Sequence, residues 1–408
     1  NKRMKQTRPL DGIRVLDLTH VLAGPFATGQ LAMMGADVIR VERPAGDDFV
    51  RAHGGTDAMK AAGLGASFLS QNAGKRSVVI DLKSKKGRQV FFDLLVTADV
   101  ITENFRPGVV DRLGIGFEPC TALKPDIIYA SLSGFGPSGP LANRPAYDHI
   151  LQGISGLMAM TGTDQSGPMR VGLPIVDYVA GQTLITAILA AFLQRAKTPE
   201  TAQHLQISML DAITTMMGAY ALHHQATGQL RGLDGNRAFS DSPFSGRFET
   251  SNGQLVITAN TPAQALRLCK AIDQEGLADV SDPADVQRVL RDTLLRRSAD
   301  HWEDVLSAAH VPAARIRTLA EIMDHPQMQN SRAWGDLAVA ELGRTFKVPS
   351  LAFSAPWQVE TLEPAPVQGR DTVSILCELG YSPDQIATLH HDAVISVQTT
   401  VPPKGAAR

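Results

Sequence analysis

The chain has 408 residues, with 39 lysines and arginines against 41 aspartates and glutamates, and a formal net charge of −2 at pH 7. A nearly neutral chain gives no support for binding to nucleic acid or to an anionic membrane. Its length predicts two domains, and its 44% hydrophobic content is enough to form a sizeable core.

The three cysteines, Cys120, Cys269 and Cys377, lie far apart and form neither a CxxC pair nor a zinc-ligand spacing. A signal peptide has an apolar stretch after its basic first residues, and no such stretch is present here. No apolar run approaches the roughly 18 residues of a membrane span without a polar interruption. We therefore expect a soluble protein of the reducing cytoplasm.

Strands and helices alternate through the first third of the chain. A helix is expected to begin at Pro25 and to end at Gly35, and Ser84 can cap another helix. This alternation predicts an α/β fold: a Rossmann-like, doubly wound parallel sheet with helices on both faces. Buried strands are predicted at residues 13–18, 38–42, 77–82, 99–105 and 127–132.

Beyond Asp148 the pattern becomes helical and then changes again. An Asn252-Gly253 turn predicts a β-hairpin over residues 246–258, after a polar linker at 228–243. Further helices are predicted at 150–160, 179–195 and 207–220 and again between the hairpin and Ala309. We expect a large domain at 1–225, a linker with a smaller α+β domain at 226–328, and a further segment at 329–408.

Asp177 lies at the centre of the stretch 170–183, where a predicted short strand broken by Gly172 and Pro174 meets the helix 179–195. A carboxylate at a strand-to-helix junction can form the floor of a cleft. The simpler interpretation is an N-cap, because aspartate often precedes an apolar helix. From the residues alone, the N-cap is the favoured interpretation.

Basic residues follow several of the predicted strands. Because the carboxyl ends of parallel strands meet at one edge of a sheet, these residues are expected to lie close together. They suit a ligand that carries several phosphates, although each is also typical of a solvated surface. His20, after the first strand, is a further polar candidate. The four cations are Arg43, Lys83, Arg106 and Arg112.

Three other kinds of site have weaker support. Glu42 is where a ribose-binding acid of a nicotinamide-dependent oxidoreductase would lie, but the first turn lacks the G-x-G-x-x-G fingerprint and contains Pro25. The adjacent histidine pairs at 223–224 and 390–391 are poorly spaced to share a metal ion. No G-x-S-x-G motif supports a serine nucleophile.

At this point the sequence resembles a known family, the class III CoA-transferases, also called the CaiB/BaiF family. The resemblance runs in order along nearly the whole chain and is more specific than any single motif above. It rests on PLDGIRVLDLT from Pro9, AGPF from Ala23, GADVIRVERP from Gly35, GKRS from Gly74, ENFRPG from Glu103, and the segment from Tyr147 to Met158.

The resemblance implies that Asp177 is the covalent nucleophile of a CoA transfer from an acyl-CoA thioester to a free carboxylic acid. It implies no metal or redox cofactor. It also implies a homodimer of interlocked rings in which the C-terminal segment returns to the large domain. The residues expected to line the CoA channel are His20, Leu22, Ala23, Arg43, Ile80, Lys83, Asn104, Phe105, Arg106, Arg112 and Phe135.

Two positions depart from branches of the family. Leu22 stands where the oxalate-handling formyl-CoA transferases carry glutamine, and the loop before the predicted hairpin is shorter than theirs. Tyr147 stands where the α-methylacyl-CoA racemases carry a histidine base. Since tyrosine is a weak base near neutral pH, racemisation is the less favoured alternative.

Overall fold

The computed structural model describes residues 7–44, 48–238, 240–359 and 361–398. Contacts divide the chain into two compact units. The first contains Asn1–Leu157, Arg170–Leu230 and Arg332–Arg408, and the second contains Met158–Met169 and Arg231–Ser331. The division therefore falls a few residues after the predicted limits at 225 and 328. The short excursion at Met158–Met169 was not expected.

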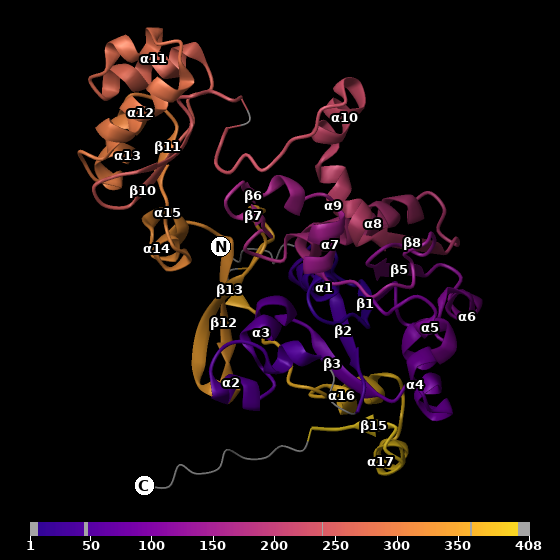
Figure 1. The fold of residues 1–408 in the computed structure, drawn as a ribbon. Helices are drawn as coiled ribbons and strands as arrows, with labels where there is room; N and C mark the ends of the chain where they lie inside the picture. The colour runs from indigo at the N-terminus through magenta and orange to yellow at the C-terminus, as the bar shows by residue number, and fades with distance from the viewer. Residues whose placement is uncertain (1–6, 45–47, 239, 360, 399–408) are drawn as a thin grey trace, which may run out of the picture. The chain divides into compact units, whose positions relative to one another are not determined.

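The first unit is built on a seven-stranded sheet with the order β15-β3-β2-β1-β4-β5-β8 (Figure 1). All neighbours pair in parallel except β15, which is antiparallel to β3. The order reverses between β1 and β4, so this is the switch point of a doubly wound sheet. The predicted α/β class is confirmed. The strands are β1 (Arg14–Asp17), β2 (Asp37–Glu42), β3 (Arg76–Ile80), β4 (Val100–Glu103), β5 (Ile128–Ser133), β8 (Gln203–Ser208) and β15 (Ile395–Ser396).

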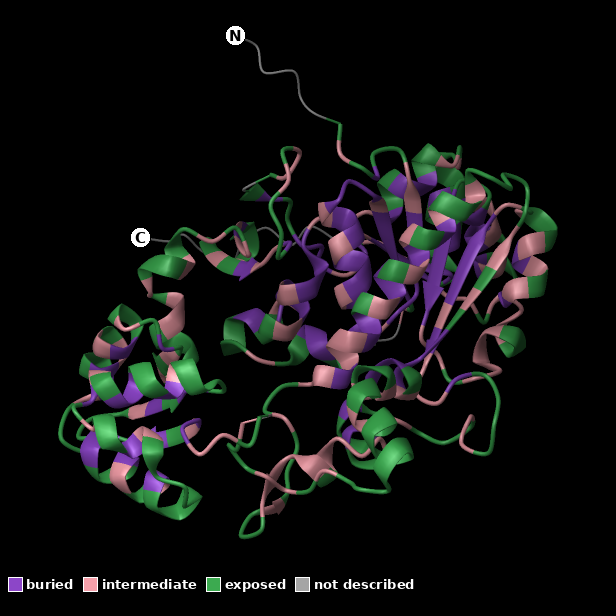
Figure 2. Ribbon diagram, turned by 90° about the horizontal axis from the view of Figure 1, so that it is seen from above, coloured by how far each residue is buried: buried purple, intermediate pink, exposed green. Residues whose placement is uncertain are grey.

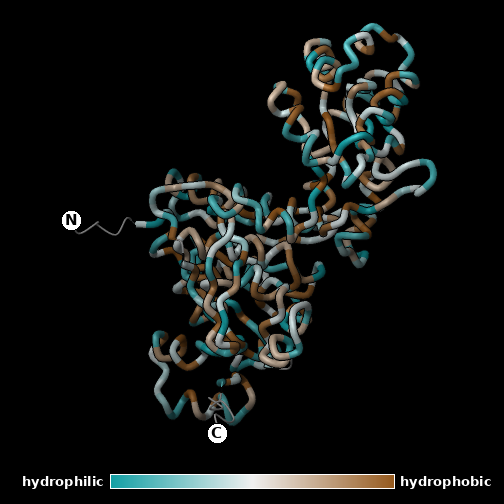
Figure 3. Tube along the Cα trace, turned by 90° about the vertical axis from the view of Figure 1, so that its left-hand side faces the viewer, coloured by the Kyte–Doolittle hydropathy of each residue, from teal (hydrophilic) through white to brown (hydrophobic). Residues whose placement is uncertain are grey.

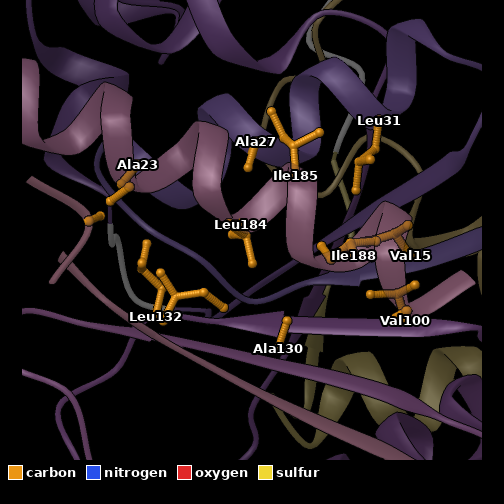
Figure 4. Packing of buried hydrophobic residues seen from close by; sticks show 14 of the residues in the cluster. Val15, Ala23, Ala27, Leu31, Val100, Ala130, Leu132, Leu184, Ile185 and Ile188 are labelled. Carbon is orange, nitrogen blue, oxygen red and sulfur yellow. The ribbon is translucent and has the colours of Figure 1, made fainter. Parts of the chain in front are cut away.

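Helices cover both faces of this sheet, and Figure 2 shows its strands largely buried. On one face α1 (Ala23–Met33) and α8 (Ile175–Arg195) pack on β1, β4 and β5 through one apolar cluster, part of which is seen in Figure 4. On the other face a second cluster joins the strands to α4 (Lys85–Leu95), α6 (Phe117–Leu123), α16 (Thr372–Glu378) and α17 (Pro383–His391). Ser84 caps α4, as predicted, by accepting a hydrogen bond from the Gly87 amide.

A smaller cluster in the first unit packs the region after β2 against a second sheet of order β13-β12-β14. The segment after Arg332 thus returns to the unit that holds the main sheet. The elements are α2 (Asp57–Ala61), α3 (Ala66–Asn72), β12 (Trp334–Val339), β13 (Arg344–Pro349) and β14 (Thr361–Leu362). The remaining helices of this unit are α5 (Val109–Leu113), α7 (Asp148–Ile154), α9 (Met209–Met216) and α10 (Gly218–Thr227).

The second unit is an α+β body with its own core. The predicted hairpin is present, with β9 and β10 paired antiparallel and β11 beside β10. Gly253 in the turn has φ +88°, a conformation that glycine adopts without strain. Its elements are β6 (Gly162–Thr163), β7 (Gly167–Pro168), β9 (Gly246–Glu249), β10 (Gln254–Ile257), α11 (Pro262–Ala271), α12 (Pro283–Leu294), α13 (Ala299–Ala308), β11 (Ala313–Arg315), α14 (Leu319–Met323) and α15 (Pro326–Gln329).

Helix α8 is long and apolar enough, by length and composition, to cross a membrane. One face of α8 belongs to the core, since Leu184, Ile185 and Ile188 are buried against α1 and the sheet (Figure 4). Figure 3 shows hydrophilic and hydrophobic residues interspersed along the trace of both units. Buried apolar helices of globular proteins pass the same test of composition, so the test alone does not indicate a membrane protein.

Two sequence-based expectations were wrong. The segment 207–220 does not begin as a helix, because Gln203–Ser208 forms β8 at the sheet edge and α9 starts only at Met209. The stretch before Asp177 is not a strand, and α8 begins at Ile175 rather than at 179. In both places hydrogen bonds to distant residues decide where the helix starts, and a periodicity argument cannot include them.

Candidate active site

A cavity of about 1020 Å³ opens at the carboxyl ends of β1, β2, β4 and β5, at the switch point of the main sheet. Ligands of open α/β sheets bind at this place, and the volume is large enough for an extended ligand. The described residues that line it include Asp177 and eight of the eleven expected channel residues: His20, Leu22, Ala23, Arg43, Lys83, Asn104, Phe105 and Arg106.

Asp177 is the third residue of α8, not its N-cap, which is Pro174. The first turn of the helix is instead capped by Asp148, the first residue of α7. Its Oδ2 accepts hydrogen bonds from the amides of Val176 at 2.6 Å and Asp177 at 3.2 Å. The carboxylate of Asp177 is therefore not needed to cap α8, and it faces the cavity. The N-cap interpretation of Asp177 is wrong.

Asp148 is itself fixed from the side. Gln152, one turn further along α7, donates a hydrogen bond from Nε2 to Asp148 Oδ1 at 2.6 Å, and Gln152 Oε1 accepts from the Val171 amide at 2.8 Å. Both side chains are buried. Asp148 thus sets the position of the Asp177 backbone through a short chain of hydrogen bonds. The amides of Val176 and Asp177 that Asp148 binds are therefore not free to bind an oxyanion.

Burial, with a smaller contribution from the nearby charge of Asp148, raises the pKa of Asp177 from 3.8 to about 7. A carboxylate in this environment is poorly solvated and therefore more nucleophilic than one in water. Perturbed carboxyl groups that face a cavity are candidates for catalysis. The geometry and the electrostatics of the cavity thus both single out Asp177.

The turn between β1 and α1 forms another wall of the cavity. Asn104, which follows β4, holds His20 twice: its Oδ1 accepts from the His20 amide and its Nδ2 donates to the His20 carbonyl, both at 2.8 Å. The His20 ring packs edge-on against Phe105, with 5.4 Å between the ring centroids. The strand ends on both sides of the switch point are joined in this way.

Three of the four predicted strand-end cations, Arg43, Lys83 and Arg106, line the cavity. The fourth, Arg112, lies on α5 and is not among the described residues that line it. A further cation, Arg144, does line the cavity from the loop before α7, and sequence reasoning missed it. Charged residues in an irregular loop have no periodicity to reveal them.

Two apolar candidates also lie elsewhere. The side chain of Ile80 is fully buried in the core between the sheet and α4. Phe135 packs against the apolar cluster on the opposite face of the sheet, and neither residue is among those lining the cavity. Val21 and Asp48 line the cavity although neither was among the expected channel residues. Within the described residues, no group of three or more histidine, cysteine or acidic side chains is arranged to hold a metal ion.

Together the strand order, the cavity at the switch point and the buried carboxylate define an α/β enzyme with its site at the carboxyl edge of a parallel sheet. The model of CoA-transferase family III matches residues 10–372, and the chain belongs to this family. The resemblance seen in the sequence is confirmed.

Relatives named as CoA-transferases match most of the chain. A succinate–glutarate CoA-transferase of Agrobacterium fabrum is 33% identical over 91% of this chain and 96% of its own length. An acetyl-CoA:oxalate CoA-transferase of Acetobacter aceti is 37% identical over 79% of this chain and 84% of its own length. A crystal structure of a CaiB/BaiF family protein from Brucella suis superposes with a TM-score of 0.80, at 29% identity over 92% of this chain and all of that one.

Proposed function

We propose that this chain transfers CoA from an acyl-CoA to a free carboxylic acid at the cavity described above, with Asp177 as the covalent nucleophile. The observation that carries the proposal is the Asp177 carboxylate, which faces the cavity while Asp148 caps its helix in its place. Membership of CoA-transferase family III supports the reaction class.

The first half of the reaction forms an enzyme-bound CoA. A carboxylate oxygen of Asp177 attacks the thioester carbonyl of the donor, the C–S bond breaks, and CoA leaves as its thiolate. A mixed anhydride of Asp177 and the donor acid remains. The thiolate then attacks the Asp177 carbonyl, the anhydride C–O bond breaks, and the donor acid leaves as its carboxylate. Asp177 is now a thioester with CoA.

The second half repeats these steps in reverse order with a different acid. The acceptor carboxylate attacks the Asp177 thioester, CoA thiolate leaves, and a mixed anhydride with the acceptor forms. The thiolate then attacks the acceptor carbonyl, which yields the new acyl-CoA and restores the Asp177 carboxylate. Charge, electrons and protons balance without an added oxidant or reductant. We therefore propose that the reaction requires no metal or redox cofactor.

The cavity offers separate environments for the parts of an acyl-CoA. Arg43, Lys83 and Arg106 provide positive charge for its phosphates, whereas Leu22 and Ala23 provide a more apolar wall. We propose that His20, Asn104 and Phe105 complete the channel. Several relatives are named for succinate, glutarate, oxalate or mesaconate, so we propose a small dicarboxylic acid as the acceptor.

We also propose that the active protein is an interlocked homodimer, as the resemblance implied. Helix α10 has no buried residue in the single chain. Exposed apolar side chains also lie on the two helices that precede α10 in the chain, among them Leu193 on α8 and Met216 on α9. A helix with no buried face needs a partner surface, and a second copy of the chain would supply one.

The test is to trap the enzyme-bound acyl group. The chain is incubated with an acyl-CoA alone, treated with hydroxylamine and digested, and the peptides are weighed by mass spectrometry. We expect a hydroxamate on the peptide containing Asp177, because an anhydride or thioester there reacts with hydroxylamine and a free carboxylate does not. Asp177→Asn should show no hydroxamate, and its CoA transfer should fall by orders of magnitude.

A panel of acyl-CoAs and of mono- and dicarboxylic acids then defines the reaction. Exchange of CoA between acids supports the proposal, whereas epimerisation of an α-methylacyl-CoA without exchange would establish the racemase alternative. If Asp177→Asn transferred CoA at nearly the normal rate, with deamidation excluded by mass, the nucleophile would lie elsewhere and Asp148 would be examined next.

A further inference from the structure

Val21 is in an unusual backbone conformation at the wall of the cavity. Its φ is +69°, in the left-handed region. For a β-branched residue this region is strongly disfavoured, because Cβ and its two substituents crowd the backbone. Such strain persists only where the surroundings hold the residue in place, and it is concentrated at functional sites. The contacts around Val21 therefore indicate what holds it.

Polar groups of the backbone from Thr19 to Val21 are bound by side chains from flanking segments. Arg40 Nη1, from β2, donates to the Thr19 carbonyl at 3.1 Å. Asn104, after β4, binds both the amide and the carbonyl of His20. The carboxylate of Asp48 accepts from the Val21 amide, at 3.2 Å to Oδ1 and 3.1 Å to Oδ2. The bond to Asp48 is the one made by the strained residue itself.

The Asp48 carboxylate is itself fixed in place and can therefore restrain Val21. Its side chain is 1% exposed, and Arg40 Nη2, also 1% exposed, binds its Oδ2 at 2.6 Å. Arg40 and Arg51 are in turn paired with Glu42. Asp48 also accepts a longer bond from the Val50 amide at 3.4 Å. Each buried charge in this group has an opposite neighbour, so the carboxylate is both compensated and fixed.

The strained residue leads directly into the first turn of α1. Leu22 is the N-cap of this helix, and Leu22 and Ala23 line the same cavity as Asp177. Among the described residues, the structure gives no hydrogen-bond acceptor for the amides of Leu22 and Ala23. Free amides at a helix start favour negative charge nearby. The direction of the Leu22 and Ala23 amides depends on the backbone conformation of Val21, which immediately precedes Leu22.

We propose that Asp48 is a positioning residue for CoA transfer: its carboxylate holds Val21 in the left-handed conformation and so directs the start of α1 toward the Asp177 side of the cavity. The inference rests on the proposed function for its kinetic consequence. The restraint itself is a property of the fold and can be measured without turnover.

The test uses the fact that glycine adopts φ +69° without strain. Four proteins are compared: the wild type, Asp48→Asn, Val21→Gly and the double variant. For Asp48→Asn we expect kcat to fall about tenfold or more while the KM for acyl-CoA changes less than about threefold. Val21→Gly should lower kcat less than Asp48→Asn does. The double variant should recover about tenfold relative to Asp48→Asn, because a glycine in place of Val21 no longer needs the restraint.

The same cycle is measured for urea-induced unfolding, where the two changes should again be less than additive. Asp57→Asn is the matched control, since the Asp57 side chain is fully exposed, and it should change neither measurement. If Asp48→Asn does not fold, Asp48→Glu keeps the charge beside Arg40, displaces the carboxylate, and is expected to be rescued by Val21→Gly in the same way.

The inference would be overturned if the effects of the two changes on kcat simply multiplied in the double variant. A rise in the KM of Asp48→Asn at unchanged kcat would overturn it as well. In either case Asp48 would not act through Val21. Additive changes in unfolding would overturn it too. A wild-type chain that transfers CoA between no pair of acids would contradict the proposed function instead, and the unfolding cycle would still decide whether Asp48 restrains Val21.

Discussion

Asp177 illustrates how a single carboxyl group is altered by its surroundings. Its backbone is held by Asp148, while burial and the Asp148 charge raise its pKa to about 7. In the proposed mechanism only the ionised form of Asp177 attacks the thioester, so the fraction of active enzyme should increase as the pH rises through this value. Two consequences, one kinetic and one for stability, follow from the same shift.

The kinetic prediction concerns the pH dependence of CoA transfer. We expect kcat/KM for the acyl-CoA to rise with pH up to about 7 and then to level, as measured by initial rates from about pH 5.5 to 8.5. An ordinary carboxylate would already be ionised throughout this range. A flat profile would therefore show that ionisation of Asp177 does not control the reaction.

The same group should make the folded state less stable as the pH rises. Because the pKa of Asp177 is higher in the folded chain than the ordinary 3.8, the folded state binds the proton more tightly, and this contribution is lost between about pH 4 and 7. Asp177→Asn should accordingly unfold at a higher urea concentration than the wild type at pH 8, with the difference shrinking toward pH 4.

The contributions of individual basic residues to CoA binding can be distinguished by whether each residue lines the cavity. Lys83 lines the cavity, and Arg112 is not among the described residues that do. Since a charge-assisted contact to a phosphate contributes about 1.5–3 kcal/mol, Lys83→Ala should raise the KM for acyl-CoA about tenfold or more. Arg112→Ala should change the KM for acyl-CoA less than about twofold, because no such contact is expected there. Equal effects in steady-state kinetics would mean that Arg112 also contacts the phosphates, in addition to the α5 residues Val109 and Leu113 that line the cavity.

At the scale of elements, the first turn of α1 and the second turn of α8 lie close together because of Gly181. A Cβ at this position would lie 2.8 Å from the Ala23 carbonyl oxygen and 2.7 Å from Cδ1 of Phe26. A side chain at position 181 could therefore be accommodated only if one of the two helices moved. Gly181 is one turn beyond Asp177, so this contact sets the spacing between Asp177 and the start of α1.

Gly181→Ala should therefore lower the free energy of unfolding by about 1–3 kcal/mol, through overpacking, and also reduce kcat. Gly218→Ala is the matched control, because a Cβ at Gly218, in the first turn of α10, would meet nothing within 4 Å. That change should be neutral or slightly stabilising. Urea unfolding and steady-state kinetics measure both effects. If the two alanine variants behaved alike, the close crossing of α1 and α8 would not matter for the site.

At the scale of the whole molecule, the exposed apolar side chains of the first unit bear on assembly. Leu193 on α8 is 73% exposed and Leu222 on α10 is 66% exposed. Large exposed apolar side chains are typical of an interface between subunits. The proposed homodimer would cover them.

We expect sedimentation analysis to give twice the mass of the chain, and the double change Leu193→Asp and Leu222→Asp to weaken or abolish the dimer. Leu319→Asp is the control. Leu319 is 71% exposed, but it lies on α14 of the second unit. A monomeric wild type, or a dimer unaffected by the double change, would contradict the proposed assembly surface.

Much of the fold could be predicted from the sequence, because it depends on patterns between residues that are close together in the chain. Apolar stretches of strand length alternate with helical ones through the first third of the chain, and this pattern predicts the parallel sheet and its carboxyl edge. Most of the cavity residues, including Lys83 and Asn104, follow directly from where strands end. Asp177 required the family resemblance, since its local pattern alone favoured an N-cap.

The tertiary structure decided what depends on contacts between distant residues. Asp148 caps α8 from 28 positions before Val176, and this contact leaves Asp177 free to face the cavity. Asp48 binds the amide of Val21 from 27 positions away, in a conformation that valine does not choose by itself. Neither bond has a sequence signal, because its free energy depends on burial and on groups that only the folded chain brings together.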